Sequence, residues 1–68
     1  MTLHEAMREV ISSQNRMMTA DEIADLVNEQ NLYSRGDGTP VPPSQIRARA
    51  RKYSGMFKVF NGLIGLAY

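Results

Sequence analysis

The chain has 68 residues, with eight Lys and Arg against seven Asp and Glu, and it contains no Cys. We expect one domain, 1–68, with a small core, because a domain of this length buries only about 60% of its unfolded surface. The absence of cysteine excludes a disulfide framework and a thiolate metal site. A single histidine, His4, cannot build a His-rich metal site, and no apolar run reaches the roughly 20 residues of a membrane helix.

The charges are divided unevenly between the two halves. Residues 1–34 carry two cations and six acids, a net charge of −4, whereas residues 35–68 carry six cations and one acid, a net charge of +5. Such a division favours a second half that faces a polyanion. The alternative is that the two halves pair and neutralise each other. The first residues lack the basic and apolar stretches of a signal peptide, so we expect a cytoplasmic domain, at the nucleoid if it binds DNA.

The first helix is predicted over residues 3–14. Thr2 precedes Glu5 by three residues, which is the spacing of a capping box. The apolar residues that follow recur at i, i+3, i+4, i+7 and i+8, the stripe of an amphipathic helix. The polar residues 12–15 weaken the pattern, so the helix is expected to end there.

A second helix is predicted over residues 20–30. Thr19 and Glu22 repeat the capping-box spacing, and acids stand in the first turn, where they favour the helix dipole. Asn31 is expected to end this helix in a left-handed conformation. The apolar pair at residues 17–18 is a candidate for a very short strand that pairs with a later one.

Residues 32–43 form a connector with turn signals, because they contain Asp37-Gly38 and three prolines. Leu32, Tyr33 and Val41 are expected to anchor it to the core. Arg35 in this connector is a candidate phosphate contact, although it could equally be solvated.

The third helix is predicted over residues 43–53, because Pro43 suits a first turn and Ile46, Ala50 and Tyr53 form its apolar stripe. At about 100° per residue, the opposite face carries cations and no acid. A small residue at the centre of that face would let the helix approach a groove, with basic side chains reaching phosphates on both walls. The residues on or beside this face are Ser44, Gln45, Arg47, Ala48, Arg51 and Lys52.

This face of the third helix has two interpretations. It could be an ordinary solvated surface, but such helices usually interleave acids with bases, and here none does. Nucleic-acid contact is therefore favoured, with Ser44 and Gln45 placed where recognition helices touch base edges. Arg49 lies nearer the buried edge, so it could extend its stem along apolar surface to solvent, pair with Asp37 or a carboxylate of the second helix, or contact a phosphate.

A β-hairpin is predicted after the third helix, because Asn61-Gly62 separates two β-prone runs, 56–60 and 63–68. Phe57 and Val59 are expected to face inward, opposite Ile64 and Leu66. Lys58 and Phe60 would then lie on the outer face. Lys58 and Asn61 are candidate DNA contacts at the edge and tip of this wing, and Phe60 would stack on a base, cover a partner or, more often, pack at the domain edge.

The predicted order is helix, short strand, helix, connector, helix and hairpin, which is the order of a winged helix-turn-helix. The fold class is therefore α+β, mainly α, with three helices and a C-terminal wing. We expect no enzyme, no cofactor and no metal, because the sequence has no nucleophile motif, no Gly-rich phosphate loop and no acid/base pair. His4 stands beside Glu5 without a Ser or Cys nucleophile in view.

The chain resembles the HARE-HTH winged-helix family, especially bacterial versions attached to restriction endonucleases and other DNA-processing enzymes. Nearly the whole chain is covered, and the residues that carry the resemblance are Leu32-Tyr33, Asp37-Gly38, Pro40-Val41-Pro42, Ser44-Gln45-Ile46, Ala48-Arg49, Tyr53, Phe57, Ile64 and Leu66. The segment 17–23 also fits the family's short strand before the second helix. A departure is the small Ala50, where members often carry a larger apolar residue.

The resemblance implies a module that binds double-stranded DNA, linked to restriction, DNA processing or transcription, with Ser44 and Gln45 contacting base edges or phosphates. Some members, such as the delta subunit of bacterial RNA polymerase, look more like protein-binding domains. The alternative is therefore an adaptor for a nuclease or RNA polymerase. Its contact surface would be the acidic first two helices or the wing edge around Phe60 and Tyr68.

Overall fold

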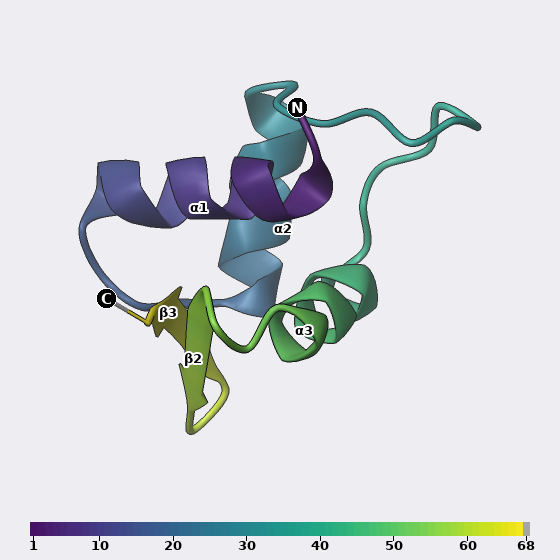
Figure 1. The fold of residues 1–68 in the computed structure, drawn as a ribbon. Helices are drawn as coiled ribbons and strands as arrows, with labels where there is room; N and C mark the ends of the chain where they lie inside the picture. The colour runs from purple at the N-terminus through teal and green to yellow at the C-terminus, as the bar shows by residue number, and fades with distance from the viewer. Residues whose placement is uncertain (68) are drawn as a thin grey trace.

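Three helices and a three-stranded antiparallel sheet form the described part of the chain, residues 1–67 of this computed structural model. Figure 1 shows α1 crossing α2, with α3 and the small sheet side by side below α1. This α+β, mainly helical arrangement confirms the predicted fold class. The elements are α1 (Leu3–Gln14), β1 (Met18–Thr19), α2 (Ala20–Glu29), α3 (Pro43–Lys52), β2 (Phe57–Phe60) and β3 (Leu63–Leu66).

Both predicted capping boxes are present and start α1 and α2. The Thr2 N–H donates to Glu5 Oε1 at 2.8 Å, and the Thr2 hydroxyl accepts from the Glu5 N–H at 3.3 Å. The Thr19 N–H donates to Glu22 Oε1 at 2.9 Å, and the Thr19 hydroxyl accepts from the Glu22 N–H at 3.2 Å. Each box satisfies backbone donors that a helix start leaves without an intrahelical partner.

The end of α2 is a Schellman motif, in which Asn31 takes the left-handed conformation predicted for it, with φ of 53°. The Leu32 N–H donates to the Val27 carbonyl at 3.1 Å, and the Asn31 N–H donates to the Asn28 carbonyl at 3.2 Å. These bonds close the last turn and direct the chain into the connector. The helix itself ends at Glu29, one residue before the predicted end.

The sheet has the strand order β1-β3-β2, so the hairpin strand β3 is central. The predicted short strand is present one residue further along, and its Met18 pairs with Ile64. Asn61 and Gly62 connect β2 to β3 with φ of 51° and 78°. Two positive φ values in a two-residue loop are those of a type I′ turn, which suits the twist of a hairpin and explains the Asn-Gly pair.

One prediction about the wing needs correction. Phe57 and Val59 do lie opposite Leu66 and Ile64, as expected. Phe57 is 2% exposed, but Val59 is 58% exposed and therefore does not join the core. Val59 lies on the edge strand β2, where the hairpin projects beyond the helices (Figure 1), whereas its partner Ile64 on the central strand β3 is 1% exposed. The predicted second strand reached Tyr68, which lies outside the described residues.

The core fills the space between the helices and the inner face of the sheet. It holds α3 in place through the buried Ile46 and Ala50, while Tyr53, just past the end of α3, packs at its margin. Among residues 1–67, no helix is long and apolar enough to cross a membrane. The largest fully buried side chains are Leu3, Met7, Val10, Met18, Ile23, Val27, Val41, Ile46 and Ile64.

The connector is anchored as predicted. Val41 is buried, and Leu32 and Tyr33 are half-buried and packed against the core. The remaining residues of the connector loop outward at the side of the molecule (Figure 1). The chain therefore reaches the start of α3 at a fixed point, which determines which face of α3 is turned outward.

Candidate nucleic-acid interface

The outer face of α3 carries the side chains that the sequence placed there. Pro43 stands in the first turn, so Ser44 and Gln45 follow directly at the N-terminal end. Gln45 and Arg49 are half-buried at the edges of this face. The exposed residues between those edges are Ser44, Arg47, Ala48, Arg51 and Lys52.

The cations of the second half have no acidic partner within the described chain. None of the Lys and Arg side chains between residues 35 and 67 lies within 4.0 Å of a carboxylate oxygen of residues 1–67. An ion pair is seen instead inside the first half, between Arg16 Nη2 and Glu22 Oε2 at 3.4 Å. Among residues 1–67, the acids of the first half therefore do not neutralise the cations of the second half by direct ion pairs. The ion pair that was one alternative for Arg49 is likewise not formed within residues 1–67.

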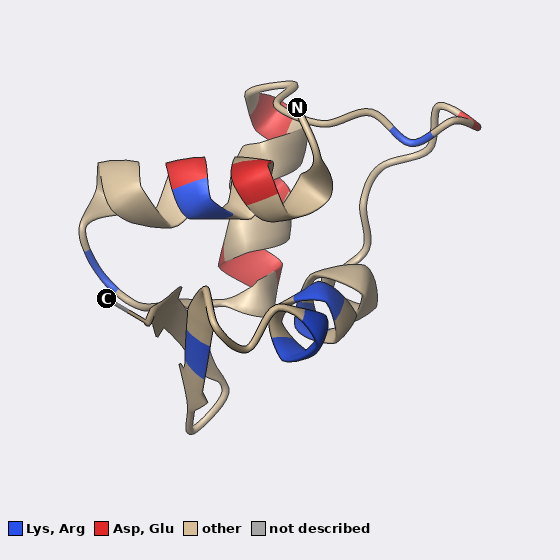
Figure 2. Cartoon of the chain, in the orientation of Figure 1, with Lys and Arg blue, Asp and Glu red and all other residues tan. Residues whose placement is uncertain are grey.

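The two signs of charge are separated in space as well as in sequence. In Figure 2 the charged residues of α3 and β2 are all Lys or Arg and those of α2 are all Asp or Glu, whereas α1 and the connector carry both signs. The exposed cations of α3 lie together on its outer face, whereas Lys58, the cation of β2, lies on the strand face that it shares with Phe60. A positive surface without interleaved acids attracts a polyanion at long range.

The C-terminal end of α3 is fixed by an aromatic contact. The rings of His4 and Tyr53 stack with centroids 4.0 Å apart, which ties the start of α1 to the residue after α3. The Lys52 ammonium lies 5.8 Å from the centre of the Tyr53 ring, within the range of a cation–π interaction. This contact gives His4 a packing role and holds Lys52 near the helix end.

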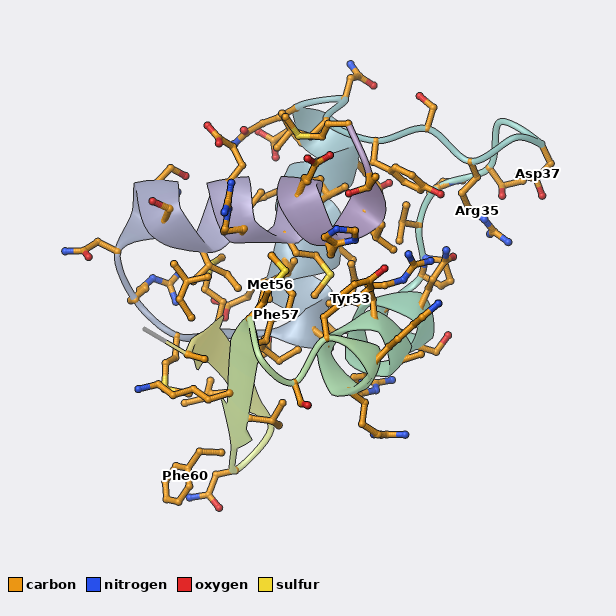
Figure 3. All side chains as sticks on the ribbon, viewed as in Figure 1. Arg35, Asp37, Tyr53, Met56, Phe57 and Phe60 are labelled. Atoms are coloured by element: carbon orange, nitrogen blue, oxygen red, sulfur yellow. The ribbon has the colours of Figure 1, made fainter. Side chains whose placement is uncertain are left out.

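The wing presents Lys58, Phe60 and Asn61 to solvent. Lys58 and Phe60 alternate with the inward-facing residues of β2, so they share its outer face. Phe60 is 66% exposed, so the expectation that it packs at the domain edge is wrong. Its ring projects from the wing on the side away from α3 (Figure 3).

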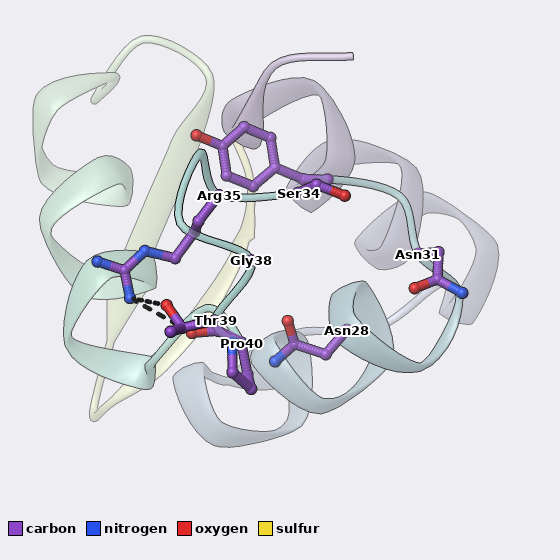
Figure 4. A pocket seen from close by; sticks show the side chains of 8 residues that line it. Asn28, Asn31, Ser34, Arg35, Gly38, Thr39 and Pro40 are labelled. Atoms are coloured by element: carbon purple, nitrogen blue, oxygen red, sulfur yellow. Dashed lines mark hydrogen bonds between the residues drawn. The ribbon is translucent and has the colours of Figure 1, made fainter.

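Arg35 is held inside the connector. Its Nη1 donates to the Thr39 hydroxyl at 3.0 Å and to the Pro40 carbonyl at 3.4 Å, at the rim of an open pocket of about 200 Å³ (Figure 4). In Figure 3, α3 lies between Arg35 and the wing. Arg35 is therefore not brought together with Lys58 and Asn61, and its guanidinium already orders a loop.

Asp37 closes the same loop. The Thr39 hydroxyl donates to Asp37 Oδ1 at 2.7 Å, and the Thr39 N–H donates to the same oxygen at 3.0 Å. These bonds, with the hydroxyl first, hold the pKa of Asp37 below its ordinary value. The only acid of the second half thus stays ionised at the tip of the connector, and Figure 3 places it away from the wing.

Sequence reasoning missed Asn28, whose side chain makes two hydrogen bonds to the backbone of Val41. An Asn inside a helical pattern gives no local sign of a partner thirteen residues later.

Within residues 1–67, no three His, Asp or Glu side chains gather in a way that could hold a metal ion. No family model, curated protein or solved structure matches this chain.

Proposed function

We propose that the chain is a winged-helix module, similar to HARE-HTH domains, that binds double-stranded DNA in the cytoplasm and serves restriction, DNA processing or transcription. Helix α3 enters the major groove with Ser44 and Gln45 toward base edges. Lys58 and Asn61 of the wing follow the neighbouring backbone. The residues that reach phosphates from α3 are Arg47, Arg51 and Lys52.

The observation that carries this proposal is the exposed basic face of α3 without a carboxylate partner in residues 1–67. Cations gathered on one helix face repel one another, and phosphates relieve that repulsion. Ala48 at the centre of the face keeps the helix narrow there, and a major groove about 12 Å wide accepts an α-helix. The narrow outer face of α3 and its positive charge therefore both favour double-stranded DNA as the ligand.

The test is the salt dependence of binding to a short labelled duplex, measured by fluorescence anisotropy. Each phosphate contact makes the negative slope of log affinity against log salt steeper by about 0.9. Arg51→Ala should therefore weaken binding to all sequences and make this slope less steep by about that amount. Arg16→Ala is the matched control, since it removes the same charge from the acidic half. Binding that does not depend on salt, or no binding at low salt, would refute the proposal.

A second candidate function is a protein-binding adaptor for a nuclease or RNA polymerase. The exposed apolar side chains of Val59 and Phe60, at 58% and 66%, favour it, because they leave apolar surface on both faces of the projecting tip, which suits a protein contact. Complex formation with a purified partner that survives both nuclease treatment and Arg47→Ala would support this function over DNA binding.

A further inference from the structure

The outer face of the wing carries an aromatic ring, Phe60, that the proposed duplex interface does not use, beside Lys58, a cation of that interface. Phe60 is 66% exposed, and its ring projects away from α3 (Figure 3). An aromatic side chain left in water at a projecting tip has a large apolar face available for another flat group. A groove-bound α3 would leave this ring free to contact a different part of the nucleic acid.

The backbone that carries Phe60 is well ordered by its surroundings. Phe60 pairs with Leu63 across the hairpin, and the next two residues are the positive-φ pair Asn61-Gly62. A type I′ turn fixes the register of the two strands. The backbone that carries the ring is therefore fixed beside the turn, so stacking on the ring costs little further backbone ordering.

The charge beside the ring fits a nucleic-acid strand. Lys58 lies two residues before Phe60 on the same face, with Gly65 directly across from it. No Asp or Glu follows Asp37 in the sequence, so neither hairpin strand carries an acid. A cation next to an exposed aromatic is the combination by which proteins hold single strands: the base stacks on the ring and the phosphate meets the cation.

We infer that the outer face of the wing binds an unpaired nucleobase, with the base stacked on Phe60 and its phosphate at Lys58. The inference rests on the proposed DNA binding and deepens it. It names duplexes with an extrahelical base as preferred ligands over intact duplexes. A base inside a continuous stack has no free face, whereas an extrahelical base stacks on Phe60 without the cost of unpairing.

The experiment compares two labelled duplexes that differ only in whether a central 2-aminopurine is paired or bulged. The wild-type protein should bind the bulged duplex about fivefold or more tightly, at the lower end of what base–aromatic stacking provides. It should also quench the emission of the bulged 2-aminopurine. Phe60→Ala should abolish the preference and the quenching and leave affinity for the intact duplex within about twofold, since most of that affinity comes from phosphate contacts.

Two variants make the comparison specific. Phe60→Trp should keep the preference, because the larger ring also stacks. Val59→Ala is the matched control: it shortens the other exposed apolar residue of the tip, on the opposite face of the same strand, and should keep the preference. Circular dichroism should show all variants folded, since both side chains are exposed.

The outcomes separate the two proposals. Equal binding of both duplexes, or a preference that survives Phe60→Ala, overturns the wing inference and leaves DNA binding by α3 standing. A loss as large in Val59→Ala as in Phe60→Ala also overturns it, because the effect would then belong to the apolar tip as a protein contact would. Binding to neither duplex at low salt refutes the proposed function together with the inference.

Discussion

The side-chain amide of Asn28 holds the backbone of Val41 by two hydrogen bonds. Asn28 Nδ2 donates to the Val41 carbonyl at 3.1 Å, and Asn28 Oδ1 accepts from the Val41 N–H at 2.9 Å. Val41 is buried, so without these bonds its peptide groups would lack partners. The bonds join the end of the connector to α2 two residues before Pro43 starts α3, and so help to set the position of the proposed recognition helix.

Asn28→Ala should lower the free energy of unfolding by about 1–3 kcal/mol, because it removes two net-favourable bonds and leaves backbone groups of Val41 unsatisfied. Urea unfolding followed by circular dichroism measures this loss. Gln30→Ala is the control, since Gln30, two residues further on at the end of α2, is an exposed amide without such a partner among the described residues. Equal stabilities of the two variants would show that the bonds to Val41 contribute nothing.

The capping carboxylate of Glu22 makes stability depend on pH. The Thr19 N–H first, and then Arg16, hold the pKa of Glu22 below its ordinary value of 4.5. A lowered pKa in the folded state stabilises the protein fully above the unfolded-state pKa, and this contribution is lost as pH falls through the folded-state pKa. The thermal midpoint should therefore fall with acidification below about pH 4.5.

Glu22→Gln should reduce that acid-dependent fall, because Gln can keep the capping-box geometry but does not titrate in this range. Asp25→Asn removes an exposed carboxylate of the same helix that makes no capping bond, so it serves as the control. If both variants lose the same amount of stability on acidification, the capping box is not the source of the pH dependence.

Gly65 and Met17 give a third prediction. A Cβ at Gly65 would stand 2.7 Å from Met17 Cγ, closer than real carbon atoms approach. Gly65→Ala should therefore destabilise the protein by about 1–3 kcal/mol, the usual cost of overpacking. Met17→Ala in the same chain should recover part of this loss, which a double-mutant cycle measures as a coupling energy. Additive effects would show that the two side chains do not compete for this space.

The helices and the wing could be predicted because their signals are local. Thr19 and Glu22 are three residues apart, and Asn61-Gly62 is adjacent to both strands that it joins. The exposure of Val59 could not be predicted, since alternation gives the face of a strand but not how far the strand extends past the core. The Asn28–Val41 bonds depend on two segments meeting in space, which no periodicity encodes.

The candidate site was predictable to a similar extent. Helical periodicity placed Arg47 and Arg51 outward because the buried Ile46 and Ala50 fix the rotation of α3. The position of Arg35 was not predictable from the sequence, because its hydrogen bonds depend on how the connector closes around Thr39. Thus Arg47 and Arg51 on α3 were assigned to the correct face, whereas the hydrogen bonds of Arg35 in the connector were not predicted.

The last prediction separates base readout from phosphate contact on α3. Gln45 stands in the first turn, where a recognition helix meets base edges, and its amide can bond adenine bidentately. Gln45→Ala should therefore reduce the difference in affinity between preferred and other sequences by about 1–3 kcal/mol. Arg47→Ala should instead weaken binding to every sequence by a similar factor and leave that difference unchanged.

Selection from a random duplex library, followed by titration of the preferred sequence and a scrambled one, measures both effects. The two variants serve as controls for each other, because each removes one side chain from the first half of the same helix. A Gln45→Ala protein that keeps its full sequence preference would place base readout elsewhere on the molecule. A sequence-dependent effect of Arg47→Ala would assign that guanidinium to a base, such as guanine, instead of to the backbone.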